Sequence, residues 1–479
     1  MKLITPQVWR MYTLSPLHIG TGETLSPLDY IVHGNTFYRI RQEELYELVQ
    51  EHIDGGTRDF ASWIGEQMSA MRNLRDNRAQ SDLNNKTNAL TYFQNRGKQR
   101  ELLQALQQRP QGGQMVLLDD QNQHRNRQGP KLGDVREAIR TGGQAYLPGS
   151  SIKGSIRTAL LYDYLQRHGD IAKLEPLIHR QLTNSRTRKE YFASPLEAEV
   201  FFCPQEERGK IRPQEAQMDL LKWLSVSDAY ATAAPALEVG KINLYLVEKE
   251  QRQRRPTGRL LAARQPQASY AEMIPTGCEL RTTVQFDTAV LVQLLQRLDK
   301  GKIEVRGNTY YHALTTRLKR LFDLSDEQLK TQDAPALQDA ILAHCQAAVA
   351  RFSQAQWQRQ QAWLDDYASQ QDPENFGPRI QSGSQPIAGH AGPQFHLGYA
   401  AGFNATTVLL YFLQKDDAHR QLFERIMAKY ELGKAPGQKG RYVPKISRFP
   451  KSRRLVEKEH VIQPLGWLAL LRPDESLPA

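Results

Sequence analysis

The stretch 147–165 combines side chains that could bind a phosphate group. Lys153 and Arg157 are four residues apart, and Ser150 and Ser151 precede them. Like charges at this spacing repel by about 0.2 to 0.5 kcal/mol, and the positive end of the helix dipole disfavours cations there. Backbone N–H groups, hydroxyls and two cations together suit a phosphate or a nucleic-acid backbone. The alternative is a capped core helix whose cations pair with nearby carboxylates.

The helix that would position these cations is expected to be buried along one face. Ile152, Ile156, Leu160 and Tyr164 recur every four residues, which is the spacing of a helical face. The Pro-Gly pair at the start of the stretch ends the preceding element, and the serines can cap the first turn of the helix. Residues 149–154 have the glycine spacing of a Walker A loop, but a serine follows where that motif needs lysine. Nucleotide hydrolysis is therefore not indicated.

Two glycine turns and two basic segments are further candidates for ligand binding. Spaced glycines let a backbone approach a ligand, and aromatic rings beside basic residues can stack on the bases of single-stranded RNA. The alternatives are ordinary tight turns and solvated loops. The glycine turns contain His18, Gly20 and Gly22, and, in the loop 395–403, Gly398 and Gly402. The basic segments are 249–264, with Arg252, Arg254, Arg255 and Arg259, and 434–454, with Lys445 and Arg448.

Composition narrows the class of protein. The chain has 479 residues, 40% of them hydrophobic, and a net charge of +11, which predicts two or three domains and favours a polyanionic partner. Its cysteines, Cys203, Cys278 and Cys345, are too far apart in sequence for a zinc knuckle or a disulfide framework. Neither a metal nor a cofactor is expected. The sequence begins without a signal peptide and contains no run of 18 apolar residues, so a cytoplasmic protein is predicted.

The order of expected elements indicates an α+β protein built on antiparallel sheet. Strand, glycine turn, hairpin and helix follow one another at the start, and a polar, helical insertion is expected at 55–143. A domain boundary is expected near 233–235. The remaining expectations are strands at 8–14, 30–32, 36–40, 242–247, 280–286 and 464–471, helices at 42–51, 171–189, 288–298, 310–322 and 336–363, and a polar linker at 381–392.

Several separated motifs resemble one family, the repeat-associated mysterious proteins (RAMPs) of type III CRISPR systems. The resemblance covers both halves of the chain, and the combination is more specific than any single motif. The motifs are LSPLHIGTGETLSPLDYI at 14–31, YLPGSSIKGSIRTALL at 146–161, SVSDAY at 225–230, EMIPTGCEL at 272–280, HLGYAAGF at 396–403 and PLGWLAL at 464–470. Within the family, the length and the second and last motifs most resemble the fifth subunits of type III-A (Csm) complexes.

The resemblance implies two tandem ferredoxin-like, RNA-recognition-motif-like domains at 1–235 and 236–479, each with helical insertions. It implies a non-catalytic subunit that binds crRNA and target RNA, packs against the adjacent backbone subunit and caps the Csm complex at the crRNA 3′ side. Such a subunit would support crRNA maturation and antiviral interference. The basic excursion at 249–270 would correspond to the family's thumb-like hairpin. The loop 395–403 has fewer glycines than is usual in the family.

Three other functions fit parts of the sequence. A metal-independent repeat endoribonuclease would use His18 or His396 as general acid or base, with Lys153 stabilising the phosphorane. A target-cleaving backbone subunit would need an aspartate beside the target strand, for which Asp29 and Asp120 are candidates. A structural adaptor would use its basic surfaces to bind acidic proteins.

Overall fold

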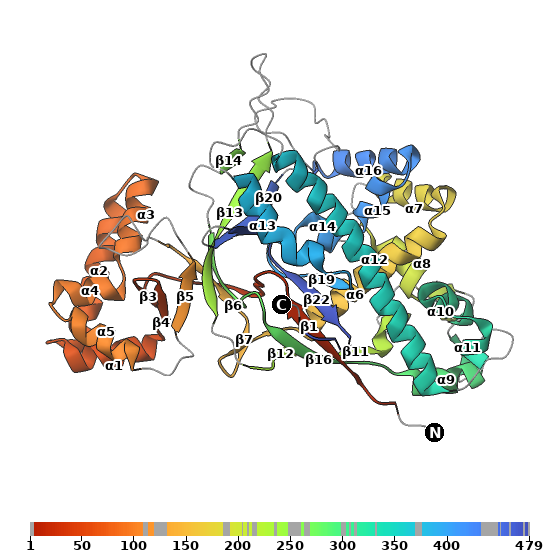
Figure 1. Ribbon diagram of the computed structural model, residues 1–479, viewed down its shortest axis with the longest axis horizontal. Helices are drawn as coiled ribbons and strands as arrows, with labels where there is room; N and C mark the ends of the chain where they lie inside the picture. The colour runs from red at the N-terminus through yellow and green to blue at the C-terminus, as the bar shows by residue number, and fades with distance from the viewer. Residues whose placement is uncertain are drawn as a thin grey trace, which may run out of the picture.

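The computed structural model is a mixed helix-and-sheet structure with a helical lobe at one end (Figure 1). Below, contacts and absences refer to the residues that the structure describes. These are 4–108, 114–118, 132–184, 192–203, 205–207, 210–212, 218–233, 237–247, 260–262, 269–297, 303–305, 308–310, 314–330, 333–368, 376–432, 449–450, 452–458, 461–472 and 475–477.

The first large sheet has β1 near its centre, between β22 and β16. Both neighbours run antiparallel to it, with Met11 opposite Leu280 on one side and Leu470 on the other. The order is β19 (Gln394–His396), β22 (Trp467–Leu471), β1 (Gln7–Thr13), β16 (Glu279–Phe286), β12 (Ala229–Ala231), β8 (Gln144–Leu147) and β7 (Arg140–Thr141), and β11 (Leu224–Val226) also pairs with β16.

The second large sheet is centred on β13. Most of its pairs are antiparallel, but β13 pairs in parallel with β5, and β15 with β6. The order is β2 (Gly20–Leu25), β6 (Val135–Ala138), β15 (Ser269–Met273), β13 (Glu238–Val247), β5 (Gln114–Leu118), β4 (Thr36–Arg39) and β3 (Tyr30–His33). The strands β14 (Leu260–Ala262) and β20 (Ser452–Lys458) also pair with β13, and β21 (Val461–Gln463) pairs with β20.

Helices cover these sheets and form the lobe. The lobe helices are α1 (Gln42–His52), α2 (Gly56–Asn73), α3 (Asn77–Lys86), α4 (Ala89–Asn95) and α5 (Gln99–Gln107). The others are α6 (Gly149–His168), α7 (Ile171–Thr183), α8 (Ser194–Phe201), α9 (Thr288–Gln296), α10 (Leu314–Phe322), α11 (Asp326–Lys330), α12 (Ala334–Ala368), α13 (Phe376–Gly389), α14 (Phe403–Thr406), α15 (Leu409–Gln414) and α16 (Asp417–Lys429). A small sheet has the order β10 (Lys210–Arg212), β9 (Gln205–Glu207), β18 (Asn308–Tyr310) and β17 (Ile303–Val305), and a 3₁₀ turn covers Leu220–Trp223.

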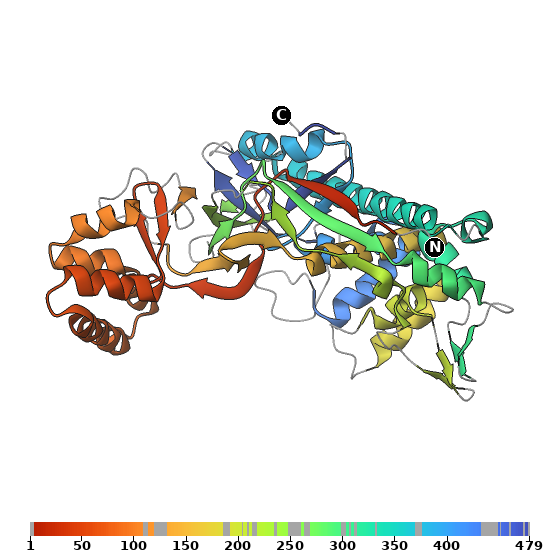
Figure 2. The ribbon, with the colours of Figure 1, turned by 90° about the horizontal axis from the view of Figure 1, so that it is seen from below.

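The helical lobe stands away from the helices that cover the first sheet (Figure 2). It has an aromatic core of its own, in which Phe60, Trp63, Tyr92 and Phe93 pack together. Helices therefore occupy 56–107 of the expected insertion at 55–143, whereas β5, β6 and β7 follow and join the sheets. The aromatic residues explain how a segment with a polar composition still forms a packed unit.

The alternating pattern of β1 and β16 builds the main core. Buried residues recur at every second position of β16, from Leu280 to Phe286, because successive side chains of a strand point to opposite faces. Ile152, Ile156 and Leu160 of α6 are fully buried in the same core, as their spacing predicts. Burying each of these side chains stabilises the fold by about 1.5–3 kcal/mol.

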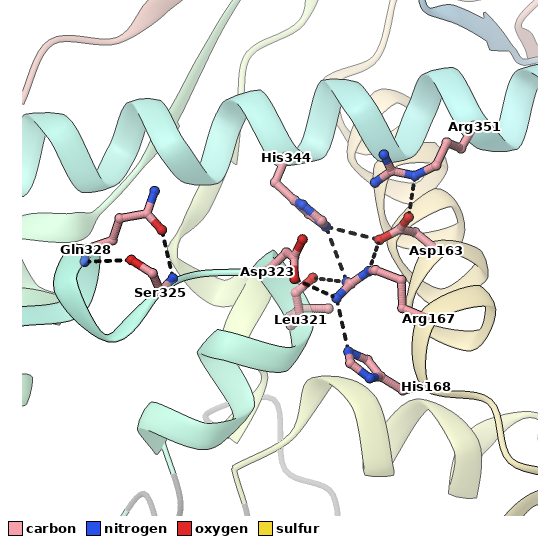
Figure 3. Close-up of polar contacts among 9 residues, drawn as sticks. All are labelled: Asp163, Arg167, His168, Leu321, Asp323, Ser325, Gln328, His344 and Arg351. Atoms are coloured by element: carbon pink, nitrogen blue, oxygen red, sulfur yellow. Dashed lines mark hydrogen bonds and ion pairs between the residues drawn. The ribbon is translucent and has the colours of Figure 1, made fainter.

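A buried carboxylate joins α6 to the long helix α12 (Figure 3). The Asp163 side chain is fully buried and accepts from Arg167 Nε at 2.8 Å and from Arg351 Nε at 2.5 Å. Its Oδ2 also lies 3.1 Å from His344 Nε2. Burial alone would raise the pKa of Asp163, but hydrogen bonds from His344 and Arg351 together bring it well below its usual range. The charged form of Asp163 therefore holds the two helices together.

Two sequence expectations differ from the structure. The polar stretch 381–392, expected as a linker, lies mostly in helix α13, although Pro386 is inside that helix. The helix packs against β21, and Gly383 allows the close approach, because a side-chain carbon there would lie 2.3 Å from the Ile462 carbonyl oxygen. Each large sheet contains strands from both sides of residue 235, so the boundary predicted there does not separate the sheets.

Candidate nucleic-acid interface

The two large sheets meet at three of the chain segments that pass from one to the other. These links follow β1, β15 and β21. Leu17 and Ile274 of the first two links exchange backbone hydrogen bonds of 2.9 and 2.8 Å, and Gly466 of the third donates to the Pro16 carbonyl at 2.8 Å. The loop after β19 joins them, because Tyr399 N donates to the His18 carbonyl at 2.9 Å. We call this region the sheet junction, comprising 15–19, 274–278, 397–402 and 464–466.

His18 is buried within the sheet junction and contacts neighbouring segments of the chain. Its ring is buried, and Nδ1 lies 2.6 Å from the Glu272 carbonyl oxygen. Burial lowers the pKa of His18, so the neutral ring is favoured. Gly398 lies so close that an added side-chain carbon would be 2.5 Å from the His18 carbonyl, and one at Gly20 would be 2.8 Å from His18 Nε2. The structure therefore brings together His18, Gly20 and Gly398 of the predicted site.

The other two predicted glycines lie nearby but are not packed in this way. Gly22 is an exposed residue of the edge strand β2, with φ of 97°, so the glycines after His18 belong to a strand rather than to a loop. Gly402 has φ of 77° and precedes α14. Positive φ values explain both glycines through backbone conformation.

A buried carboxylate neutralises part of the positive charge beside the sheet junction. The Glu272 side chain is fully buried and pairs with Arg140 Nη2 at 2.8 Å and Arg39 Nη1 at 3.5 Å. It also accepts from Ala138 N at 2.9 Å. The described ion pairs of Glu272 therefore involve arginines of β7 and β4, and not Arg136, the arginine of β6.

Arg136 and Arg454 flank one aromatic ring at the junction. The Arg136 guanidinium carbon lies 4.5 Å from the centre of the Tyr399 ring, and that of Arg454 lies 5.2 Å from it. Arg454 also donates to the Tyr399 hydroxyl. Burial and then the nearby Arg136 lower the pKa of Arg454. Among the described side chains, no carboxylate forms an ion pair with either arginine, so neither guanidinium has a described ionic partner.

The start of α6 is engaged by protein groups. Gly149 N donates to Asp228 Oδ1 at 2.8 Å, so Asp228 of the SVSDAY motif occupies the capping position, and no side-chain cap from Ser150 or Ser151 is found. Ser150 is exposed and Ser151 is half-buried. A side-chain carbon at Gly149 would lie 2.2 Å from the Val226 carbonyl, which explains that glycine.

Both cations of α6 also have protein partners. Lys153 Nζ donates to the Leu224 carbonyl at 2.7 Å, and burial lowers the pKa of Lys153. Arg157 Nη1 pairs with Asp219 at 2.6 Å, Arg157 Nη2 lies 3.5 Å from Glu197, and its guanidinium stacks on the Phe201 ring. This arrangement matches the alternative in which the cations pair with nearby carboxylates. A phosphate contact by Lys153 and Arg157 stays a prediction.

The remaining predicted basic residues lie outside the described residues. They are Arg252, Arg254, Arg255 and Arg259 of the first basic segment and Lys445 and Arg448 of the second. Asp120 also lies outside them.

The candidate catalytic side chains are not arranged around a common site. His18 and His396 are buried, and His396 stacks on Trp467 with ring centres 4.2 Å apart. Burial lowers the pKa of His396 to about 3. Asp29 Oδ2 accepts from the Ser26 backbone N and hydroxyl, each at 2.7 Å. Within the described parts of the chain, no cluster of three or more His, Cys, Asp or Glu is arranged to hold a metal ion.

Sequence reasoning did not select Arg136, Tyr399 or Arg454 individually. Tyr399 and Arg454 adjoin predicted residues, in the loop 395–403 and at the end of the segment 434–454. Arg136 lies in a stretch read as a polar insertion, and no local pattern distinguishes it from the arginines around it. Only the pairing of β6 with β15, and of β20 with β13, brings Arg136 and Arg454 together.

Comparison with known proteins decides the family. The model of the RAMP superfamily matches residues 10–338. The chain belongs to the RAMP superfamily. A curated relative, "CRISPR system Cms protein Csm5" of Streptococcus thermophilus, is 28% identical to this RAMP protein over 154 residues. That match covers 32% of the chain and 36% of the relative, so the chain spans well under half of the relative's length.

Two solved structures share the fold of this RAMP protein. One is a chain of a Csm–crRNA–target RNA ternary complex from a type III-A CRISPR–Cas system, with a TM-score of 0.59 and 20% identity, covering 98% of this chain and 100% of that one. The other is the crystal structure of T. onnurineus Csm5, with a TM-score of 0.54 and 18% identity, covering 96% and 100%. No described helix is both long and apolar enough to cross a membrane.

Proposed function

We propose that this RAMP protein is a non-catalytic, crRNA-binding subunit of a type III-A Csm complex, which caps the crRNA 3′-side end beside the adjacent backbone subunit. The observation that carries the proposal is the pair of arginines at the sheet junction, Arg136 and Arg454, whose charges no described carboxylate balances. Guanidinium groups bind phosphates, and guanidinium groups and aromatic rings stack on bases. The similarity to Csm5 and to a chain of an RNA-bound Csm complex supports the same partners, crRNA and target RNA.

The proposal includes the domain organisation that the family resemblance implies. Two ferredoxin-like units, each related to RNA-recognition motifs, would lie at 1–235 and 236–479, and both would contribute strands to each of the two large sheets. The exposed edge strand β2 and the loop 397–402 would lie along the RNA path. Burial of His18 and His396 favours a structural role for both rings over acid–base catalysis.

Co-purification tests this proposal. A tagged full-length chain would be expressed with a complete type III-A operon and a repeat–spacer array, and the preparation analysed for bound RNA and for partner subunits. We expect crRNA and the other Csm subunits to co-purify, and we expect crRNA with heterogeneous 3′ ends when the chain is deleted. Recovery of Csm subunits on a chain that never contacts RNA in ultraviolet crosslinking would contradict the RNA-binding role and favour a protein adaptor.

The purified chain also tests the alternative function, a metal-independent repeat endoribonuclease. Purified wild-type chain would be incubated with repeat RNA in EDTA beside a His18→Gln variant. We expect both samples to leave the RNA intact. Cleavage that depends on His18 would contradict the proposal.

A further inference from the structure

A cavity with both polar and apolar walls opens directly beside the arginines of the sheet junction. Its volume is about 530 Å³, and it lies between α12, the loop that follows β19, and strand β20. Tyr399 and Arg454 line it as well as the junction surface. A water molecule needs only about 30 Å³. The cavity is therefore large enough for an organic group reaching in from that surface.

Three buried polar side chains line this cavity with atoms that no described group satisfies. They are Gln356, Asn404 and His396, which are 3%, 6% and 9% exposed. The unsatisfied atoms are Gln356 Oε1, Asn404 Oδ1 and His396 Nδ1. A buried polar atom without a partner destabilises the fold, because its hydrogen bonds to water are not replaced. Three such atoms in one cavity therefore indicate a ligand that supplies hydrogen bonds.

Other polar groups on the same wall are satisfied within the protein. Arg453 Nε donates to Gln360 Oε1 at 2.7 Å, and its Nη1 donates to the carbonyls of Pro450 and Ser452 at 2.8 and 3.0 Å. Gln360 lies one turn beyond Gln356 on α12 and lines the same cavity. Gln360 is thus satisfied within the protein, whereas Oε1 of Gln356, one turn away on the same helix, is not.

Aromatic residues also line the cavity, together with aliphatic side chains. Phe403 and Phe449 line the cavity with ring centres 4.7 Å apart and an interplanar angle of 80°. Tyr399 lies at the side where Arg454 is exposed. Aromatic rings combined with amide side chains are the surroundings in which proteins hold single nucleobases that have left the stack.

From this arrangement we infer that the cavity accepts one unstacked nucleobase of the RNA that crosses the sheet junction, and that the base carries an exocyclic amino group. The inference rests on the proposed RNA-binding function. Arg454 would contact the adjacent phosphate while the base enters past Tyr399. Both unsatisfied amide atoms are carbonyl oxygens, which only accept hydrogen bonds. An amino group supplies two donors to them, whereas uracil supplies a single ring N–H.

Cytosine and uracil allow a matched test, because they have the same size and differ mainly in the amino group. The affinity of the full-length protein for fluorescein-labelled rC12 and rU12 would be measured by anisotropy at one salt concentration. One or two additional hydrogen bonds of about 1 kcal/mol each predict roughly five- to thirty-fold tighter binding of rC12. Equal affinities of the wild-type protein would overturn the inference while leaving RNA binding in place.

Variants connect the preference to the cavity. Gln356→Met and Asn404→Leu, singly and together, keep side-chain volume and remove the acceptors. We expect the rC12 preference to fall toward one and the affinity for rU12 to stay unchanged, which also shows that the variants fold. A preference that survives the double substitution would place base recognition elsewhere and overturn the inference. Absence of binding to either RNA by the wild-type protein would instead overturn the proposed function itself.

Discussion

The buried carboxylate between α6 and α12 makes a sharp prediction about stability. Asp163 is fully buried and has three cationic or titratable partners, Arg167, Arg351 and His344 (Figure 3). Breaking a buried ion pair by removing one partner costs about 3–5 kcal/mol. Because the Arg351 side chain is 47% exposed and water solvates it, we expect Asp163→Asn to lower the free energy of unfolding by about 3 kcal/mol, at the lower end of that range.

Asp323 provides the matched control for this measurement. It lies 3.5 Å from the same Arg167, but its side chain is 69% exposed, so Asp323→Asn should cost less than about 1 kcal/mol. Its φ of 53° is tolerated by asparagine. Urea unfolding followed by far-ultraviolet circular dichroism would compare the variants with the wild type. Equal losses in the two variants would refute the view that Asp163 joins the helices.

The pKa of Asp163 leads us to expect that the stability of the folded chain depends on pH in the acid range. The pKa of Asp163 is lower in the folded chain than in the unfolded chain, where it is about 3.9. Its stabilisation is therefore complete above about pH 4 and is lost as pH falls toward the folded-state pKa. The difference in stability between the wild type and Asp163→Asn should shrink below pH 4, and a difference that stays constant would contradict this reasoning.

Three further predictions concern the junction, the cavity and α6. Gly398→Ala should lose roughly 2 kcal/mol more stability than Gly402→Ala, because only the former places a carbon within 2.5 Å of a carbonyl oxygen; equal losses in urea unfolding would contradict this. Burial lowers the pKa of His396 in the folded chain to about 3. The neutral ring therefore does not reduce the free energy of unfolding above about pH 6.5, but that free energy should drop by roughly 2 kcal/mol between pH 6.5 and pH 5, where the unfolded chain protonates the ring. His396→Gln should remove this part of the pH dependence of stability. If α6 contacts RNA as predicted, Lys153→Gln/Arg157→Gln should reduce the salt dependence of RNA affinity by about one phosphate contact per cation; an unchanged slope with lower stability would assign both residues to packing.

Local elements with a strong periodicity could be predicted from the sequence. The strands β1, β16 and β22 and the helices α6 and α12 lie within a few residues of their expected positions, because their apolar residues repeat at strand or helix spacing. Helix α13 could not be predicted, since Pro386 and its glycines favour a linker and only packing against β21 overrides them. The aromatic core of the lobe was also hidden, because Phe60 and Tyr92 are widely separated in a polar stretch.

The candidate site was predicted only in part. His18 and Gly398 are separated by 380 residues in sequence, yet both were selected from their glycine-rich surroundings, and the structure places them in contact. Arg136 was not selected, because its importance comes from β6 lying next to β15, a pairing that no short motif encodes. Arg157, in contrast, was selected for its charge, and the structure pairs that charge with Asp219. Sequence motifs thus located the junction, whereas only the fold shows which arginines are paired with carboxylates.

The salt dependence of RNA affinity tests the central claim most directly. Wild-type protein and an Arg136→Gln/Arg454→Gln variant would be titrated with a fluorescein-labelled single-stranded RNA at several salt concentrations, beside Arg420→Gln, whose arginine is exposed and paired with Asp417. We predict that the junction variant binds RNA more weakly and that its slope of log affinity against log salt is smaller by about 1.4, which is about 0.7 for each phosphate that an arginine no longer neutralises. The control should match the wild type. An unchanged affinity and slope in the junction variant would contradict the claim that these arginines bind RNA.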